Sequence, residues 1–315
     1  FFFQAHPGIR DPLWSRGLGD VYKRQKMISQ NDQAKGLFLT AVGVLAIVPD
    51  STLIRLIQAD ILTITFWRAL IPGVLISTTV LLFYRKPTLS FIKSPGASGI
   101  IFIVTHSIGT LLFVVAIELT SIASALFIIS TSPVFAALIS KIFLKEKISL
   151  RMIFTIIGAL IGIGFITFGS FNVEEFFAVG DIAALGVAIC LAISLTAARS
   201  ASNFSMIPAV GISSLLTPLC IVYFINPFNL LYLDWIYILL LGVVFAPIAT
   251  CLIATGPRYI TSAEVSLLLL LEAVLAPILA WLILFEIPHS STIYGGLIVL
   301  SVLIISNIIA LRQNR

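Results

Sequence analysis

Residues 261–286 read TSAEVSLLLLLEAVLAPILAWLILFE, and residues 121–146 read SIASALFIISTSPVFAALISKIFLKE. Both segments open with small polar residues and Ala, continue through a long apolar run that contains Pro, and end in Leu-x-Glu. An apolar run of roughly 20 residues is long enough to cross the hydrocarbon core of a bilayer as a helix. The pair therefore predicts two related transmembrane helices whose starts lie 140 residues apart.

The rest of the chain has the same apolar character. Hydrophobic residues make up 59% of the sequence and charged residues 10%, whereas an ordinary soluble domain carries roughly 25% charged residues. Ten apolar blocks lie at about 36–57, 61–84, 97–117, 120–141, 150–170, 180–200, 207–226, 235–256, 262–285 and 291–311. A segment in lipid must satisfy its own backbone hydrogen bonds, so each block is predicted to be a helix. The expected fold class is an all-α integral membrane protein with ten transmembrane helices.

The repeated segment divides the ten spans into two halves of five, at residues 36–170 and 180–311. Because five is odd, the second half enters the membrane in the opposite orientation to the first. We therefore expect two inverted five-helix repeats, an arrangement common among secondary transporters. Residues 1–26 precede Met27 and lack the apolar core and cleavage site of a signal peptide. We expect them to be a non-native or disordered extension.

Charge in the connections predicts the orientation. If the N-terminus is cytoplasmic, the cytoplasmic segments hold twelve Lys and Arg residues, and the opposite side holds only Arg55. The twelve are Lys35, Arg85, Lys86, Lys93, Lys141, Lys145, Lys147, Arg151, Arg199, Arg258, Arg312 and Arg315. The positive-inside rule then places the chain in a cell membrane with both termini in the cytoplasm. Because these charges are spread over many connections, the lipid bilayer is the expected partner and nucleic acid is not.

Three phrases resemble the EamA-like transporters of the drug/metabolite transporter superfamily. They are TITFWRALIPGVL at 63–75, ELTSIASALFIISTSPVFAALISKIFLKEKIS at 118–149 and RYITSAEVSLLLLLEAVLAPILAWLILFEIP at 258–288. The family's Leu-Gly-Glu-like turn is Leu-Lys-Glu at 144–146 and Leu-Phe-Glu at 284–286, so its Gly is replaced twice. The resemblance implies ten helices, a cavity between the halves, and transport by alternating access without ATP.

Four ionisable residues within the spans are the candidate substrate or coupling-ion site. An ionisable side chain at the bilayer centre costs about 2.5–3.5 kcal/mol on insertion scales, so it is a functional candidate by default. Glu272 follows five leucines near the middle of its span, where a carboxylate must pair with a cation or take up a proton. His106 lies near the middle of another span, Arg68 lies about two turns inside its own, and Asp50 is a counter-charge for Arg68. Packing for Glu272 and His106, and snorkelling for Arg68, are the alternatives.

Other polar and small residues receive structural interpretations. Glu264 lies near the cytoplasmic end of its span, where solvation at the interface is favoured over a role in the site. Gly158-x-x-x-Gly162 predicts a close helix contact, within the chain or with a second copy in a homodimer. The three cysteines have no metal-binding or redox spacing, so no metal is expected.

The leading functional hypothesis is a secondary active transporter that exports a small metabolite, such as an amino acid or a related compound. No cofactor is expected, although Glu272 and His106 make proton coupling a hypothesis. A membrane-embedded enzyme is the alternative, but its ionisable residues normally gather at one membrane face, and no Walker A, HExxH, GxSxG or CxxC motif is present. A channel or scaffold is the third class. Nothing in the sequence resembles a selectivity filter.

Overall fold

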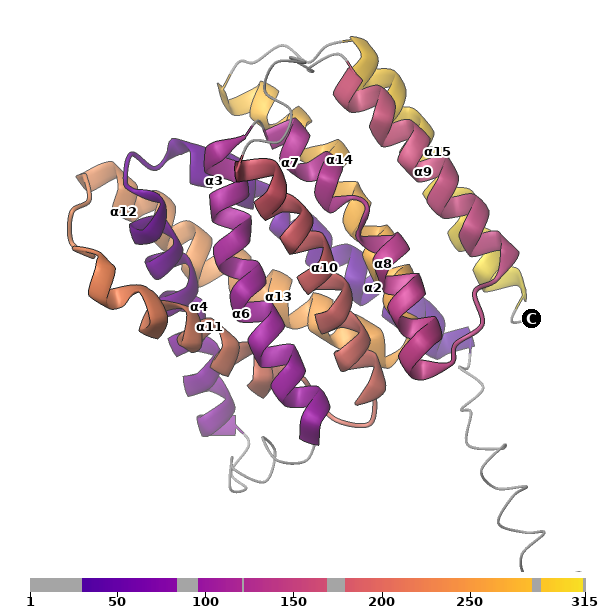
Figure 1. Ribbon diagram of the computed structural model, residues 1–315, viewed down its shortest axis with the longest axis horizontal. Helices are drawn as coiled ribbons and strands as arrows, with labels where there is room; N and C mark the ends of the chain where they lie inside the picture. The colour runs from indigo at the N-terminus through magenta and orange to yellow at the C-terminus, as the bar shows by residue number, and fades with distance from the viewer. Residues whose placement is uncertain (1–29, 84–95, 121, 169–178, 285–289, 314–315) are drawn as a thin grey trace, which may run out of the picture.

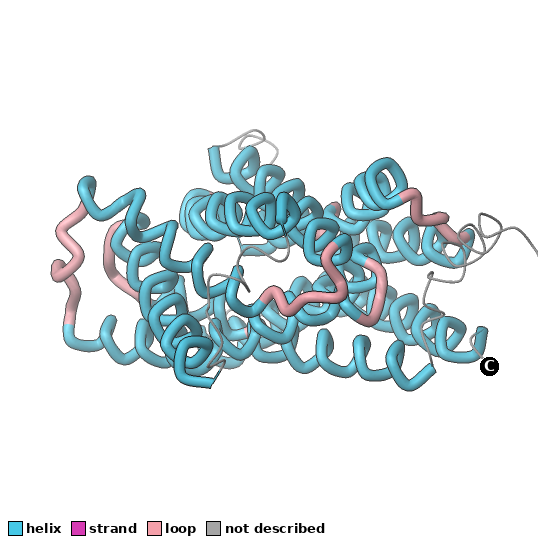
Figure 2. The backbone as a smooth tube through the Cα atoms, turned by 90° about the horizontal axis from the view of Figure 1, so that it is seen from below, coloured by secondary structure: helices cyan, strands magenta, loops and turns pink. Residues whose placement is uncertain are grey.

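The computed structural model describes residues 30–83, 96–120, 122–168, 179–284 and 290–313. Helices, and no strand, make up the ordered secondary structure of these ranges, and most connections between them are short (Figure 2). The all-α prediction is therefore confirmed. The extension predicted for residues 1–26 lies outside the described residues, as does Glu286 at the end of the second repeated segment.

The helices follow the chain in the order that the apolar blocks predict (Figure 1). The first half contains α2 (Gln30–Ile47), α3 (Pro49–Leu56), α4 (Ile61–Phe83), α6 (Gly96–Leu119), α7 (Ile122–Ile129), α8 (Ser132–Ile139), the π-helical segment η1 (Ser140–Leu144) and α9 (Leu150–Phe168). The second half contains α10 (Val179–Ser200), α11 (Ile207–Ile221), η3 (Val222–Phe224), α12 (Tyr232–Leu239), the π-helical segment η4 (Leu240–Phe245), α13 (Ala246–Thr255), η5 (Gly256–Arg258), α14 (Ser262–Leu284) and α15 (Ser290–Gln313).

Eight helical spans within the described ranges are long and apolar enough to cross a membrane. They are Asp32–Leu56, Ile61–Phe83, Gly96–Leu119, Ala125–Phe143, Val179–Ser200, Ile207–Phe224, Tyr232–Arg258 and Ser262–Ile283. The two remaining predicted spans correspond to α9 and α15, which carry shorter apolar stretches at Leu150–Phe165 and Tyr294–Ser306. The described residues thus contain eight candidate membrane spans, and the count of ten stays a prediction.

Proline interrupts two of the spans where they approach the middle of the molecule. The first span breaks at Val48, and α3 restarts with Pro49 in its first turn. The fourth breaks after Ile129, and α8 restarts with Pro133 in its first turn. Proline has no N–H to donate to the preceding turn, so it is tolerated at the start of a helix and disruptive inside one. Each break turns one long apolar segment into two shorter helices.

Helices of the two halves interleave. Contacts join α4 to α11, α6 to α10, α2 to α13, and α8 to α14. The pair formed by α9 and α15 runs side by side at the edge of the bundle (Figure 1). The outward faces of many helices carry exposed large apolar side chains, such as Phe154, Ile161 and Leu297, as expected for surfaces that face lipid.

Gly158 and Gly162 make the helix contact that their spacing predicts, and they make it within the chain. A Cβ atom built at Gly162 would lie 2.8 Å from Val299 Cγ2 and 3.0 Å from the Gly295 carbonyl oxygen, and one at Gly158 would lie 3.0 Å from Val302 Cγ2. The glycines therefore let α9 approach α15 closely. This face is occupied by α15, so the predicted homodimer would need another surface.

Gly162→Ala is expected to destabilise the protein because the added methyl group cannot fit against α15. Overpacking of this kind typically costs about 1–3 kcal/mol. Gly164→Ala is the matched control, since a Cβ atom there would meet nothing within 4 Å. The melting temperatures of both purified variants in detergent would be compared with that of the parent. Equal melting temperatures for the two variants would contradict the tight α9–α15 contact.

Candidate functional site

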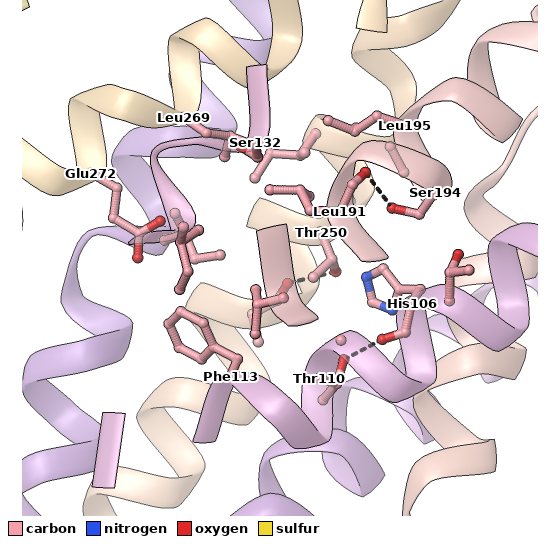
Figure 3. Close-up of a pocket in the computed structure, with 18 of the residues that line it drawn as sticks. His106, Thr110, Phe113, Ser132, Leu191, Ser194, Leu195, Thr250, Leu269 and Glu272 are labelled. Carbon is pink, nitrogen blue, oxygen red and sulfur yellow. Dashed lines mark hydrogen bonds between the residues drawn. The ribbon is translucent and has the colours of Figure 1, made fainter. Parts of the chain in front are cut away.

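A cavity of about 150 Å³ lies in the middle of the bundle. Its walls come from α2, α4, α6, α7, α8, α10, α11, α13 and α14, so both halves contribute. Three of the four predicted site residues, Arg68, His106 and Glu272, line it. Figure 3 shows Glu272 and His106 at opposite sides of the group of lining side chains.

Glu272 is buried in the middle of α14 and lines the cavity. Its Oε1 atom is buried and has no hydrogen-bond partner among the residues that the structure describes. Most buried polar groups in proteins are hydrogen-bonded, so an orphaned carboxylate oxygen calls for an explanation. A carboxylate that lines a cavity, with one oxygen unpaired within the described residues, is available to a ligand or a proton. Arg68 and Asp50 both interact with it electrostatically.

Arg68 and Asp50 form the ion pair that the sequence predicts. Arg68 Nε donates to Asp50 Oδ1 at 3.0 Å, and Arg68 Nη2 donates to Asp50 Oδ2. This two-point geometry is the strongest form of the Arg–carboxylate contact. The break before Pro49 places Asp50 in the first turn of α3, and α4 presents Arg68 to it. The guanidinium carbon of Arg68 also lies 5.0 Å from the ring centroid of Phe113, within cation–π range.

His106 lies on α6, held between an aromatic ring and a hydroxyl group. Its ring stacks on Phe102, with centroids 5.4 Å apart and an angle of 19° between the planes. His106 Nδ1 lies 3.2 Å from Ser213 Oγ on α11. The contact joins a helix of the first half to one of the second. Both contacts hold the ring in place. His106 therefore has the hydrogen-bond partner that the packing interpretation requires, and it also lines the cavity.

Glu264 lies outside this cavity, and the expectation that solvent satisfies it is wrong. It forms a capping box at the start of α14: Thr261 N donates to Glu264 Oε2 at 3.0 Å, and Glu264 N donates to Thr261 Oγ1 at 3.2 Å. Arg151 Nη2 donates to Glu264 Oε1 at 2.7 Å. The reciprocal Thr-x-x-Glu pattern is a helix-start signal visible in the sequence. Glu264 is therefore a capping and pairing residue.

The bundle of apolar spans around a mostly apolar cavity is that of a multi-pass membrane protein. The model of the EamA-like transporter family matches the chain twice, at residues 34–168 and 178–308. The chain therefore belongs to the EamA-like transporter family and contains two of its repeats. The predicted resemblance is confirmed.

A solved crystal structure described only as that of a protein has the same fold. It superposes with a TM-score of 0.73 at 16% sequence identity, covering 88% of this chain and 99% of the other. At this identity the likeness concerns the fold alone. No curated protein matches the sequence.

Proposed function

We propose that this protein is a secondary transporter that moves a small metabolite across a cell membrane by alternating access, without ATP. The observation that carries the proposal is Glu272, a buried carboxylate in a cavity built by both halves. One of its oxygens has no hydrogen-bond partner in the described part of the chain. A passive scaffold has no need for an ionisable group at this depth, where it costs free energy. The cavity is also smaller than the roughly 300–1,000 Å³ of pockets for drug-sized ligands. This favours a small metabolite, such as an amino acid or a related compound, and we propose export as the direction.

The proposed architecture is ten spans in two inverted repeats. In such a repeat each span has an equivalent in the other half, so that α6 corresponds to α13 and α10 corresponds to α2. The contact between α6 and α10 therefore has a counterpart in the contact between α13 and α2, and both occur. The helices α4 and α11, α8 and α14, and α9 and α15 are also equivalent pairs, and the two members of each pair are in contact. These contacts support a pseudo-two-fold relation between the halves. The positive-inside rule supports cytoplasmic termini.

Proton coupling is part of the proposal. A buried carboxylate without a permanent partner can exchange a proton for a bound substrate, so substrate and proton would compete for Glu272. Flux into proteoliposomes tests the function itself. Substrate movement driven by a proton gradient supports a coupled carrier, chemical change of the substrate indicates an enzyme, and current without saturation indicates a channel. Either of the last two results would refute the proposal.

Alternating access requires contacts between the halves that form and break at the ends of the cavity. At the proposed cytoplasmic end, Arg199 Nε donates to Glu146 Oε1 at 2.9 Å, and Arg199 Nη1 donates to the Pro257 carbonyl oxygen at 3.1 Å. Glu146 follows η1 in the first half, whereas Arg199 and Pro257 belong to the second. The side chains of the Arg199–Glu146 pair are partly exposed, so water can reach the two charges when the pair separates. We propose that it opens when the cavity faces the cytoplasm.

Cross-linking positions 146 and 199 is expected to abolish flux. The variant Glu146→Cys/Arg199→Cys, made in a background without the native cysteines, would be treated with a bifunctional thiol reagent that cannot cross the membrane. A reagent on the cytoplasmic side should stop flux, and reductive cleavage should restore it. The control pair Ser202→Cys/Arg258→Cys lies within the second half, where Arg258 Nε donates to the Ser202 carbonyl oxygen at 3.2 Å. Its cross-linking should leave flux unchanged. Full flux in the linked 146/199 variant would contradict the opening, and reaction only from outside would contradict the orientation.

A further inference from the structure

Five hydroxyl groups in the cavity wall have already used their only hydrogen. Each donates to a backbone carbonyl three or four residues earlier in its own chain segment. The bonds run from Thr105 to Ile101 (2.7 Å), from Thr110 to His106 (2.9 Å), from Ser130 to Leu126 (2.5 Å), from Ser194 to Leu191 (2.9 Å) and from Thr250 to Ala246 (2.7 Å). A hydroxyl group has one hydrogen and two lone pairs. While these bonds are made, the five oxygens meet a ligand as hydrogen-bond acceptors.

The hydrogen-bond network assigns the same role to the free nitrogen of His106. Ser213 Oγ donates to the Val210 carbonyl oxygen at 2.8 Å, which uses the hydroxyl hydrogen. Its contact with His106 Nδ1 at 3.2 Å then requires the hydrogen to lie on the ring nitrogen. In neutral histidine one ring nitrogen donates and the other accepts. Nε2 of His106 is thus left as an acceptor.

The ionisable side chains of the site carry more negative than positive charge. Arg68, the cation in the described cavity wall, is bound at two points by Asp50. Glu272 adds a second carboxylate whose Oε1 atom has no hydrogen-bond partner within the described part of the chain. Ionised Arg68, Asp50 and Glu272 together carry a net charge of minus one. A ligand with one positive charge and several N–H donors would neutralise this charge and use the acceptors.

We infer that the transported compound is a small primary amine, with one ammonium group on an apolar body and no carboxylate. The inference rests on the proposed transport function and narrows its substrate. An ammonium group offers three donors, and Glu272 supplies a charged acceptor for it. Phe113, Leu126 and Val187 offer apolar surface to the rest of the molecule. A zwitterionic amino acid would bring a carboxylate into a mostly apolar wall whose five assigned hydroxyl groups are acceptors and whose guanidinium is already paired.

Direct binding to the purified full-length protein tests the inference independently of transport. Isothermal titration would compare isoamylamine with leucine, which has the same isobutyl group but adds a carboxylate, and with isoamyl alcohol, which lacks the charge. We expect isoamylamine to bind at least about tenfold more tightly than either. The alcohol lacks the hydrogen bond to a charged group, and the carboxylate of leucine would be a buried charge without a partner. Each of these losses lowers the affinity by at least about tenfold. Glu272→Gln should remove this preference. Glu118→Gln, which changes a partly exposed carboxyl group of α6 outside the cavity, should retain it.

The outcomes separate this inference from the proposed function. Tighter binding of leucine, equal binding of the amine and the alcohol, or binding of none of the three would overturn the amine assignment. Leucine flux in proteoliposomes would then still support a transporter. Amine binding that depends on Glu272, without flux of any of the compounds, would support the amine site and count against transport.

Discussion

Glu272→Gln is expected to fold and reach the membrane but to lose most of its transport. The amide keeps the shape of the side chain in α14 and removes the charge. A hydrogen bond to a charged group contributes about 1.5–3 kcal/mol, and 1.4 kcal/mol corresponds to a factor of ten. Substrate flux should therefore fall by roughly ten- to a hundredfold. Because the amide cannot exchange a proton for substrate, the remaining flux should also lose its dependence on pH.

The measurement is initial flux into proteoliposomes as a function of pH, normalised to the amount of reconstituted protein. Glu118→Gln is the control, because it changes a partly exposed carboxyl group of α6 that lies outside the cavity. His106→Ala and Arg68→Ala would also remove packing or pairing contacts. A loss of transport in these two variants would therefore not report on substrate binding alone. Parental flux and an unchanged pH profile in Glu272→Gln would reduce this residue to a packing role.

The fold was largely predictable because the bilayer restricts the choices. A block of about 20 apolar residues in lipid can only be a helix, and the repeated segment at residues 121–146 and 261–286 revealed two related halves. Pro49 and Pro133 lie at breaks within two spans, whereas Pro72 and Pro218 lie inside continuous helices, so proline alone does not predict where a span breaks. The pairing of α9 with α15 was not predictable. Gly158 and Gly162 indicated a close contact but carried no information about the partner helix.

The site was predictable where residues are unusual for their depth. Glu272, Arg68 and His106 stand out in apolar sequence, and Asp50 was the nearest counter-charge for Arg68. The acceptor hydroxyls and Phe113 were not predictable, because Thr, Ser and Phe are common in membrane helices. An all-round apolar helix also has no amphipathic stripe to show which face is turned inward. Only the packed helices show that Thr105, Thr110 and Ser194 share one cavity.

The charge balance of the site leads to a second large effect, at Asp50. Asp50→Asn would leave Arg68 as a buried cation with no full counter-charge. Removing one partner of a buried ion pair typically costs about 3–5 kcal/mol, a large part of the 5–15 kcal/mol that stabilises most folded proteins. We expect a sharply lower melting temperature and a low yield of monodisperse protein in detergent. The double variant Asp50→Asn/Arg68→Met removes both charges and should recover most of this loss, because no unpaired ion remains.

The double variant also distinguishes the two roles that the ion pair could have. Loss of Arg68 and Asp50 together leaves the net charge of the site at minus one, because Glu272 alone then carries the single negative charge. If Glu272 recognises an ammonium group, the preference for isoamylamine over leucine should persist in the double variant. If Arg68 instead binds a substrate carboxylate, leucine should be the better ligand of the parent and should lose its binding in the double variant. Titration of both compounds against the parent and the double variant decides between these roles, and the single variant Asp50→Asn serves as the stability control.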